Sequence, residues 1–177
     1  MKRLFISPSD SSPKRTLVRI GRATFVLILL TALSSCKKNV PPPDDSGYNL
    51  NVVLRGDGKV FPLGSGYIEF RQDPDTARII DLNTWIHSLE PNHSYLLQRA
   101  VNPITDPDCT STAWLTLGLG LTPQDIQTDE HGNGHADLFR AVTAIARGTQ
   151  FHIHFQIIDG VTMATVLTSD CYDYTVR

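Results

Sequence analysis

The chain has 177 residues, of which 41% are hydrophobic, and this length fits one domain with flanking segments. Six of its 16 basic residues but only one of its 18 acidic residues lie within the first 35 positions. The rest of the chain therefore carries 10 basic and 17 acidic residues, a net charge of about −7. This acidic balance, without a basic cluster, argues against nucleic-acid binding and against electrostatic adhesion to anionic lipid.

The first 35 residues have the three parts of an export signal. Basic residues precede the apolar run at residues 24–33, which is too short to span a bilayer as a helix. Small residues and a cysteine follow, and Leu33-Ser34-Ser35-Cys36 resembles the lipobox of bacterial lipoproteins. The resemblance implies that residues 1–35 are a cleaved signal peptide and that Cys36 becomes the acylated, for example palmitate-bearing, N-terminus. The alternative is a membrane anchor that ends in an ordinary thiol.

A lipid-bearing Cys36 predicts a protein of the bacterial cell envelope, on a periplasmic or surface face. The membrane is then a partner through the acyl chains, and each buried methylene contributes about 0.8 kcal/mol. Residues 36–47 contain three consecutive prolines and two acidic residues, so we expect an extended, solvated tether. A single domain should occupy residues 48–177.

Cys109 and Cys171 are the two cysteines that remain once Cys36 carries lipid. In an oxidising compartment two such cysteines are expected to form a disulfide. Two separate buried thiols are the alternative. A cysteine-based metal site is disfavoured because neither residue lies in a C-x-x-C spacing.

From residue 48 onward the chain has the pattern of short strands separated by turns. Runs rich in Val, Ile, Thr and aromatic residues alternate with Gly, Pro, Asn and Asp, and this favours an antiparallel sandwich or barrel. Asp159-Gly160 predicts a tight hairpin, and residues 143–147 suggest a brief helical turn. The expected strands are residues 49–55, 66–72, 78–89 (one strand or two with a kink), 94–101, 112–117, 125–128, 136–142, 151–158, 162–168 and 171–176.

Residues 66–112 resemble copper/zinc superoxide dismutase and related Greek-key β-sandwich domains. The motifs are a strand after Gly-Ser-Gly, a turn at Ser88-Leu89-Glu90-Pro91, and a loop that leads to Cys109-Thr110-Ser111. The resemblance is specific within residues 66–112 and extends to the rest of the predicted domain only in pattern. It implies an all-β, antiparallel Greek-key β-sandwich of the immunoglobulin-like or superoxide dismutase-like kind, with Cys109 bonded to Cys171.

The same resemblance argues against dismutase activity. Leu96 and Gln98 stand where that family has its His-x-His copper ligands, and leucine offers no lone pair to a metal. Residues 113–118 contain no ligand where the zinc-binding loop should follow, and residues 168–170 contain no arginine. We therefore expect no cofactor and no dismutation.

His152 and His154 are the best remaining metal candidates. Strand alternation puts both imidazoles on one face of residues 151–158, about 7 Å apart, opposite a face of Phe and Ile. Zn or Cu would need further ligands, for which His135, Asp137 and His131 are candidates if the strand at residues 136–142 lies alongside. The alternative is that the two histidines are ordinary side chains on a solvated strand face and bind no metal.

Other motifs give weaker indications of function. Residues 129–134 fit a hairpin turn better than a calcium loop, and no nucleophile motif, P-loop or dinucleotide fingerprint occurs. Trp85 and Trp114 could stack on a sugar or peptide, although aromatic residues of a sandwich usually belong to its core. The sequence thus predicts a non-enzymatic binding or structural module whose protein or small-molecule ligand it does not specify. The alternatives are a Zn or Cu protein using His152 and His154, and an enzyme of unrecognised type.

Overall fold

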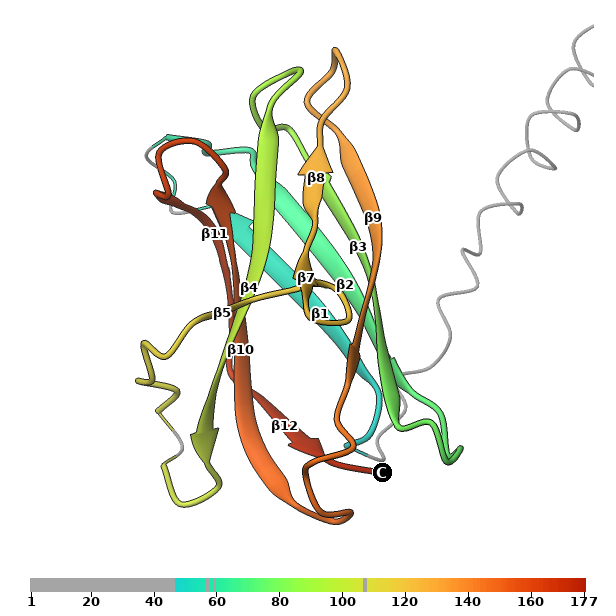
Figure 1. Cartoon of the computed structure of the whole chain (residues 1–177). Coiled ribbons are helices and arrows are strands. Elements are labelled where there is room, and N and C mark those ends of the chain that lie inside the picture. The colour runs from blue at the N-terminus through green and yellow to red at the C-terminus, as the bar shows by residue number, and fades with distance from the viewer. Residues whose placement is uncertain (1–46, 57, 59, 107) are drawn as a thin grey trace, which may run out of the picture. The chain divides into compact units, whose positions relative to one another are not determined.

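The structure is a computed structural model that describes residues 47–177 apart from 57, 59 and 107 (Figure 1). The predicted signal peptide, Cys36 and nearly all of the predicted tether lie outside the described residues. The described part contains strands and no helix, so the predicted all-β class is confirmed. The strands are β1 (Leu50–Gly56), β2 (Ser65–Gln72), β3 (Ile79–His87), β4 (Ser94–Pro103), β5 (Leu115–Thr116), β6 (Gly118–Leu119), β7 (Thr122–Pro123), β8 (Asp125–Gln127), β9 (Gly134–Ala141), β10 (Gln150–Asp159), β11 (Thr165–Ser169) and β12 (Tyr172–Thr175).

These strands form one mixed sheet that curls into a nearly closed barrel (Figure 1). Along the sheet the order is β5-β4-β10-β11-β1-β2-β3-β9-β6-β7, with β12 also paired to β10 and β8 also paired to β4. Neighbours are antiparallel except at the short contact between β6 and β9, which is parallel. No helix among the described residues has the length and apolar character needed to cross a membrane.

Alternation of side chains along each strand places the hydrophobic core inside the barrel. In β10 the side chains of Ile153, Phe155 and Ile157 are buried, and those between them point outward. Phe70 of β2 packs edge-on against Phe155 and Tyr174, with ring centroids 6.2 and 4.8 Å away. Each large apolar side chain buried in this way stabilises the fold by about 1.5–3 kcal/mol.

The barrel closes between β4 and β9 through residues 115–127, here called the seam segment. Its strand β5 pairs with β4 and its strand β6 pairs with β9, so β4 and β9 do not pair directly. Between β5 and β6 the Leu117 N–H donates to the Leu97 carbonyl oxygen at 2.8 Å. Farther along, β8 pairs with β4, and a bridge between Thr128 and Gly134 leads into β9. The closure therefore rests on short pieces of strand rather than on one continuous ladder.

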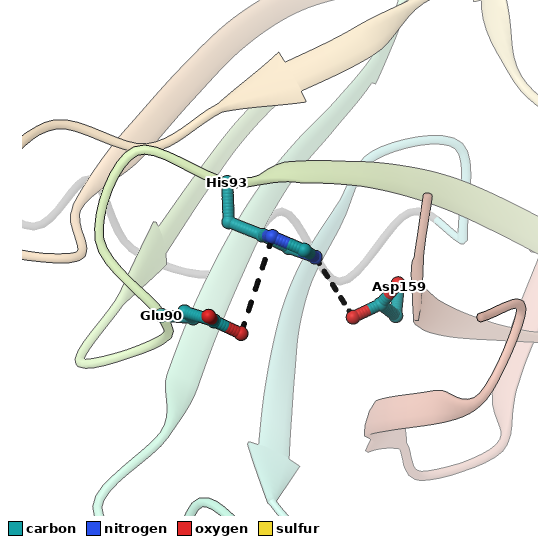
Figure 2. A group of neighbouring side chains, drawn as sticks. All are labelled: Glu90, His93 and Asp159. Atoms are coloured by element: carbon teal, nitrogen blue, oxygen red, sulfur yellow. Dashed lines mark hydrogen bonds and ion pairs between the residues drawn. The ribbon is translucent and has the colours of Figure 1, made fainter. Parts of the chain in front are cut away.

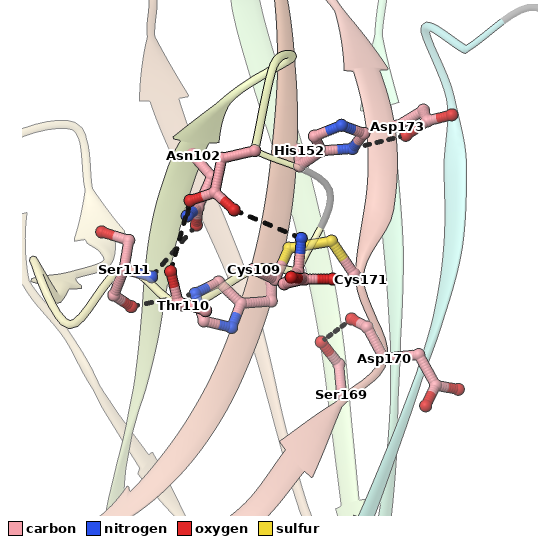
Figure 3. Close-up of a disulfide and its surroundings, with 12 residues drawn as sticks. Asn102, Cys109, Thr110, Ser111, His152, Ser169, Asp170, Cys171 and Asp173 are labelled. Atoms are coloured by element: carbon pink, nitrogen blue, oxygen red, sulfur yellow. Dashed lines mark hydrogen bonds and ion pairs between the residues drawn. A yellow bond between two sulfur atoms is a disulfide. The ribbon is translucent and has the colours of Figure 1, made fainter.

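Cys109 and Cys171 form a disulfide, as predicted, with their Cα atoms 5.9 Å apart (Figure 3). The bond joins the loop after β4 to the start of β12 across 62 residues of sequence. The buried Asn102 holds the same loop independently, because its side chain donates to Asp106 and accepts from the Ser111 N–H at 3.2 Å. The alternative of two separate thiols is excluded.

The connection between β10 and β11 is longer than the tight hairpin predicted at Asp159-Gly160. The Asp159 N–H donates to the Ala164 carbonyl at 2.9 Å, which closes a turn of six residues. The Asp159 carboxylate accepts the N–H groups of Val161 and Thr162 at 2.8 and 2.7 Å. An aspartate side chain that binds backbone N–H groups two and three positions ahead favours this wider turn.

Two other segments differ from expectation. Residues 143–147 form turns rather than a helical turn, and the Ile145 N–H donates to the Val142 carbonyl at 3.0 Å. The short strands β6 and β7 were not predicted, because a glycine-rich run carries no alternating pattern.

Candidate functional site

His152 and His154 lie on the outer face of β10, as predicted, but different partners hold the two rings. His152 Nδ1 is 2.7 Å from Asp173 Oδ1 on β12, and its Nε2 is 3.1 Å from the Ile104 carbonyl oxygen (Figure 3). His154 Nε2 is 3.2 Å from the Ser111 carbonyl oxygen. The disulfide joins the loop after β4 to the start of β12. His152 therefore contacts both of the joined segments, and His154 contacts the loop.

His154 also packs against Trp114, with ring centroids 4.7 Å apart. Burial lowers the pKa of His154 below its ordinary value of 6.5, and the contact with the Ser111 carbonyl only partly opposes this. The ring is therefore neutral at pH 7, and its packing on Trp114 is a structural contact of this loop.

His135 lies on β9, which is separated from β10 by four strands along the sheet. Its Nε2 is 3.1 Å from Asp137 Oδ1, and its ring stacks on Trp85 with centroids 4.8 Å apart. Tyr67 lies on the other side of Trp85, with centroids 6.1 Å apart. The structure thus does not bring His135 to the histidines of β10, and neighbouring rings cover the Trp85 indole.

Leu96 and Gln98, the residues at the family's copper-ligand positions, also lie on the outward face of β4. The Gln98 side chain donates to Thr116 Oγ1 at 3.0 Å and accepts from Gln156 Nε2 at 2.7 Å. Gln156 in turn accepts from Thr165 Oγ1 at 3.0 Å. The amide is therefore one link of a hydrogen-bonded chain that crosses β5, β4, β10 and the start of β11.

Among the described residues, one group of three potential ligand side chains meets in space: Glu90, His93 and Asp159, with donor atoms within 4.8 Å of one another. Figure 2 shows His93 between the two carboxylates. His93 Nε2 is 2.8 Å from Asp159 Oδ2, and Nδ1 is 4.0 Å from Glu90 Oε2. Because one ion can bind only one of these nitrogens, the exposed Glu90 side chain would have to turn toward Nε2.

Asp159 is held ionised by its surroundings. The Thr162 N–H is the largest cause that lowers its pKa, burial opposes it, and the Val161 N–H and His93 add to the lowering. The resulting pKa is about 2. Through its contact with His93, the ionised Asp159 carboxylate therefore links the turn between β10 and β11 to the turn between β3 and β4.

A cavity of about 60 Å³ lies inside the barrel next to the seam segment. A cavity needs about 10–15 Å³ to hold a single water, so this cavity has room for a small group of atoms. Its only charged lining residues are Arg99 and Arg140. The remaining lining residues are aliphatic or aromatic: Phe70, Ile80, Leu82, Val101, Leu117, Val142, Ile145, Phe151, Ile153, Phe155 and Tyr174.

Both arginines point inward because strand alternation places them on the core side. Arg99 stands between Leu97 and Val101 of β4, two residues that belong to the core or pack against it. Arg140 follows the buried Leu138 by two positions on β9. Sequence reasoning missed both arginines: the alternation within each strand indicates their inward direction, but not the cavity that they line.

The lining of the cavity is positively charged, because it includes two arginines and no carboxylate. Burial lowers the pKa of the Arg99 guanidinium, and the charge of Arg140 lowers it further. The Arg99 guanidinium still carries its charge at neutral pH, because arginine side chains are not deprotonated in proteins. Arg140 Nη1 donates to the Gly120 carbonyl oxygen at 3.0 Å.

No protein-family model and no curated protein matches the chain. A cavity with apolar walls and two fixed cations can bind an apolar group that carries negative charge. The described lining residues include no histidine, cysteine, serine or carboxylate that could act as a nucleophile or base.

Proposed function

We propose that the protein is a lipid-anchored, non-enzymatic binding module of the bacterial cell envelope, and that its ligand occupies the arginine-containing cavity. The export-signal pattern of residues 1–35 and the lipobox-like stretch that ends at Cys36 support the anchor. The disulfide between Cys109 and Cys171 supports an oxidising compartment, where such bonds persist.

The observation that carries the binding proposal is the cavity itself. Ligand sites are mostly apolar hollows with a few polar groups that fix orientation, and this cavity has that composition. The acidic balance of the exported chain argues that its membrane contact depends on the acyl chains rather than on basic residues. The relationship to superoxide dismutase-like Greek-key sandwiches stays a prediction from the sequence motifs.

The anchor is tested by labelling cells with palmitate. The wild-type chain and Lys38→Ala, a control in the same segment, should incorporate the label and sediment with membranes. Cys36→Ala should incorporate none, because its side chain cannot form the thioether to lipid. Label retained in Cys36→Ala, or a free thiol at Cys36 in the wild type, would refute the anchor.

A second candidate function is the binding of a divalent cation by Glu90, His93 and Asp159. One imidazole and two carboxylates suit Zn²⁺, and hydrogen bonds to the far oxygen of Asp159 already orient this carboxylate. Equilibrium dialysis with Zn²⁺ should find about one equivalent bound, a stoichiometry that His93→Ala abolishes.

The same assay with His152→Ala tests the alternative site predicted from the sequence. Loss of zinc in His152→Ala, with retention in His93→Ala, would move the site to β10. Less than about a tenth of an equivalent in the wild type would exclude both metal sites.

A further inference from the structure

Arg99 is a half-buried cation without a partner. Each of the other arginines among the described residues donates a hydrogen bond to a carboxylate or a carbonyl oxygen, but the Arg99 guanidinium has neither a hydrogen bond nor an ion pair. The five N–H donors of this guanidinium thus have no acceptor among the described residues, and the side chain lines an apolar cavity. An unpaired buried cation destabilises the fold unless something else satisfies it.

Arg140 strengthens this conclusion because it brings a second positive charge to the same cavity. The repulsion between Arg99 and Arg140 is not relieved by any carboxylate among the lining residues, although acidic residues outnumber basic ones in the exported chain. The cavity is therefore complementary to an anion, in contrast to the acidic protein around it.

The walls specify what else the anion must carry. Leu117 from the seam segment and Ile153 and Phe155 from β10 line the same cavity as the two arginines. Water would solvate a purely inorganic anion better than these side chains do. The volume of about 60 Å³ admits a short hydrocarbon chain, but it is less than half of the roughly 150 Å³ of an apolar cavity that binds benzene, so an aromatic ring or a long acyl chain is too large.

We propose that this cavity binds a small organic carboxylate, with the carboxylate on Arg99 and Arg140 and the hydrocarbon part against Leu117, Ile153 and Phe155. A planar guanidinium matches the two oxygens of a carboxylate through parallel hydrogen bonds. This inference rests on the proposed binding function and names the ligand class of that same site.

The test measures binding of propionate to the full chain, purified in a nonionic detergent, by ligand-observed nuclear magnetic resonance. Propionamide, which has nearly the same shape without the charge, and inorganic phosphate, which has the charge without the hydrocarbon part, are the comparison ligands. Propionate should bind with a dissociation constant of about 1 mM, a reasonable value for so few atoms. Propionamide and phosphate should bind at least about tenfold more weakly.

Variants then assign the contacts. Arg99→Met should weaken propionate binding by about tenfold or more, and Arg99→Lys by less, because lysine keeps the charge but loses the planar fork. Arg55→Met, which removes a surface arginine paired with Asp170 at 2.8 Å, should leave the affinity unchanged. Arg99→Met should also melt at the same or a higher temperature than the wild type, since it removes an unpaired cation, and this shows that the variant is folded.

The outcomes separate the ligand class from the binding function. If propionamide binds as tightly as propionate, the carboxylate proposal is wrong but the cavity stands as a binding site. If phosphate binds as tightly as propionate, the proposed contacts with the hydrocarbon part are wrong. If propionate binds equally well to Arg99→Met, the carboxylate does not lie on Arg99. If none of the three ligands binds, both the ligand class and the cavity as a binding site are refuted.

Discussion

Reduction of the Cys109–Cys171 disulfide should destabilise the domain mainly because it raises the conformational entropy of the unfolded chain. The bond closes a loop of 62 residues, and the chain-entropy model gives about 4 kcal/mol for a loop of that length. The native loop should survive reduction, because the hydrogen bonds of Asn102 to Asp106 and Ser111 do not depend on the sulfurs. A loss of that size is a large part of the 5–15 kcal/mol typical of whole domains.

The assay is urea unfolding followed by tryptophan fluorescence, with and without reductant, in the wild type and in the double variant Cys109→Ser, Cys171→Ser. With a denaturant slope of about 2 kcal/mol/M, the midpoint should fall by about 2 M on reduction. The slope itself should rise, because a chain without the cross-link exposes more surface when it unfolds. The wild type with reductant and the double variant without reductant should give the same unfolding curve.

A shift of less than about 1 kcal/mol would refute this reasoning. It would mean that the 62-residue loop is already restricted in the unfolded state, so that the bond removes little entropy. A double variant much less stable than the reduced wild type would instead show that the serines disturb the native loop.

Two further predictions concern Asp159 and the seam segment. The folded pKa of Asp159, about 2, lies below its ordinary 3.8, so its contribution to stability is complete above pH 4 and is lost as the pH falls from about 4 to 2. Asp159→Asn should thus lower the free energy of unfolding by about 1–2 kcal/mol at pH 7, after allowance for solvent screening, and by almost nothing at pH 2. Equal pH dependence in both proteins would contradict this. Gly118→Ala should destabilise by about 2 kcal/mol or more in thermal unfolding, because its new Cβ would lie 2.0 Å from the Thr122 carbonyl oxygen. Gly148→Ala, at a φ of 78° but in open space, should cost only about 1 kcal/mol, and equal losses at the two sites would refute the steric reason.

The strands could be predicted because their pattern is local. In β10 the alternation of His152 and His154 with Ile153 and Phe155 determines which face is buried, and the structure has that arrangement. The disulfide was predicted from the count of cysteines and the compartment. These conclusions need no knowledge of which strands are neighbours.

The closure of the barrel could not be predicted in the same way. The pairing of β4 with β10 and of β9 with β3 and β6 depends on contacts between distant parts of the chain. His135 illustrates the consequence, since it can join His152 only if their strands are neighbours, and they are not. The inward-facing Arg99 was missed for a different reason. A charged residue between apolar ones is usually assigned to solvent, and only the completed barrel shows that Arg99 borders a cavity.

The seam segment is a place where the proposed binding site can change, at positions other than Gly118, while the long strand pairings stay intact. The long pairings, such as the nine between β4 and β10, hold the sheet together away from this region. Leu117 reaches the cavity from a stretch tied to its neighbours by only a few hydrogen bonds. Substitutions or insertions between residues 115 and 127 can therefore reshape the cavity while every long ladder keeps its register. We expect related chains to differ most in length and composition at this point, and so to select different molecules with one scaffold.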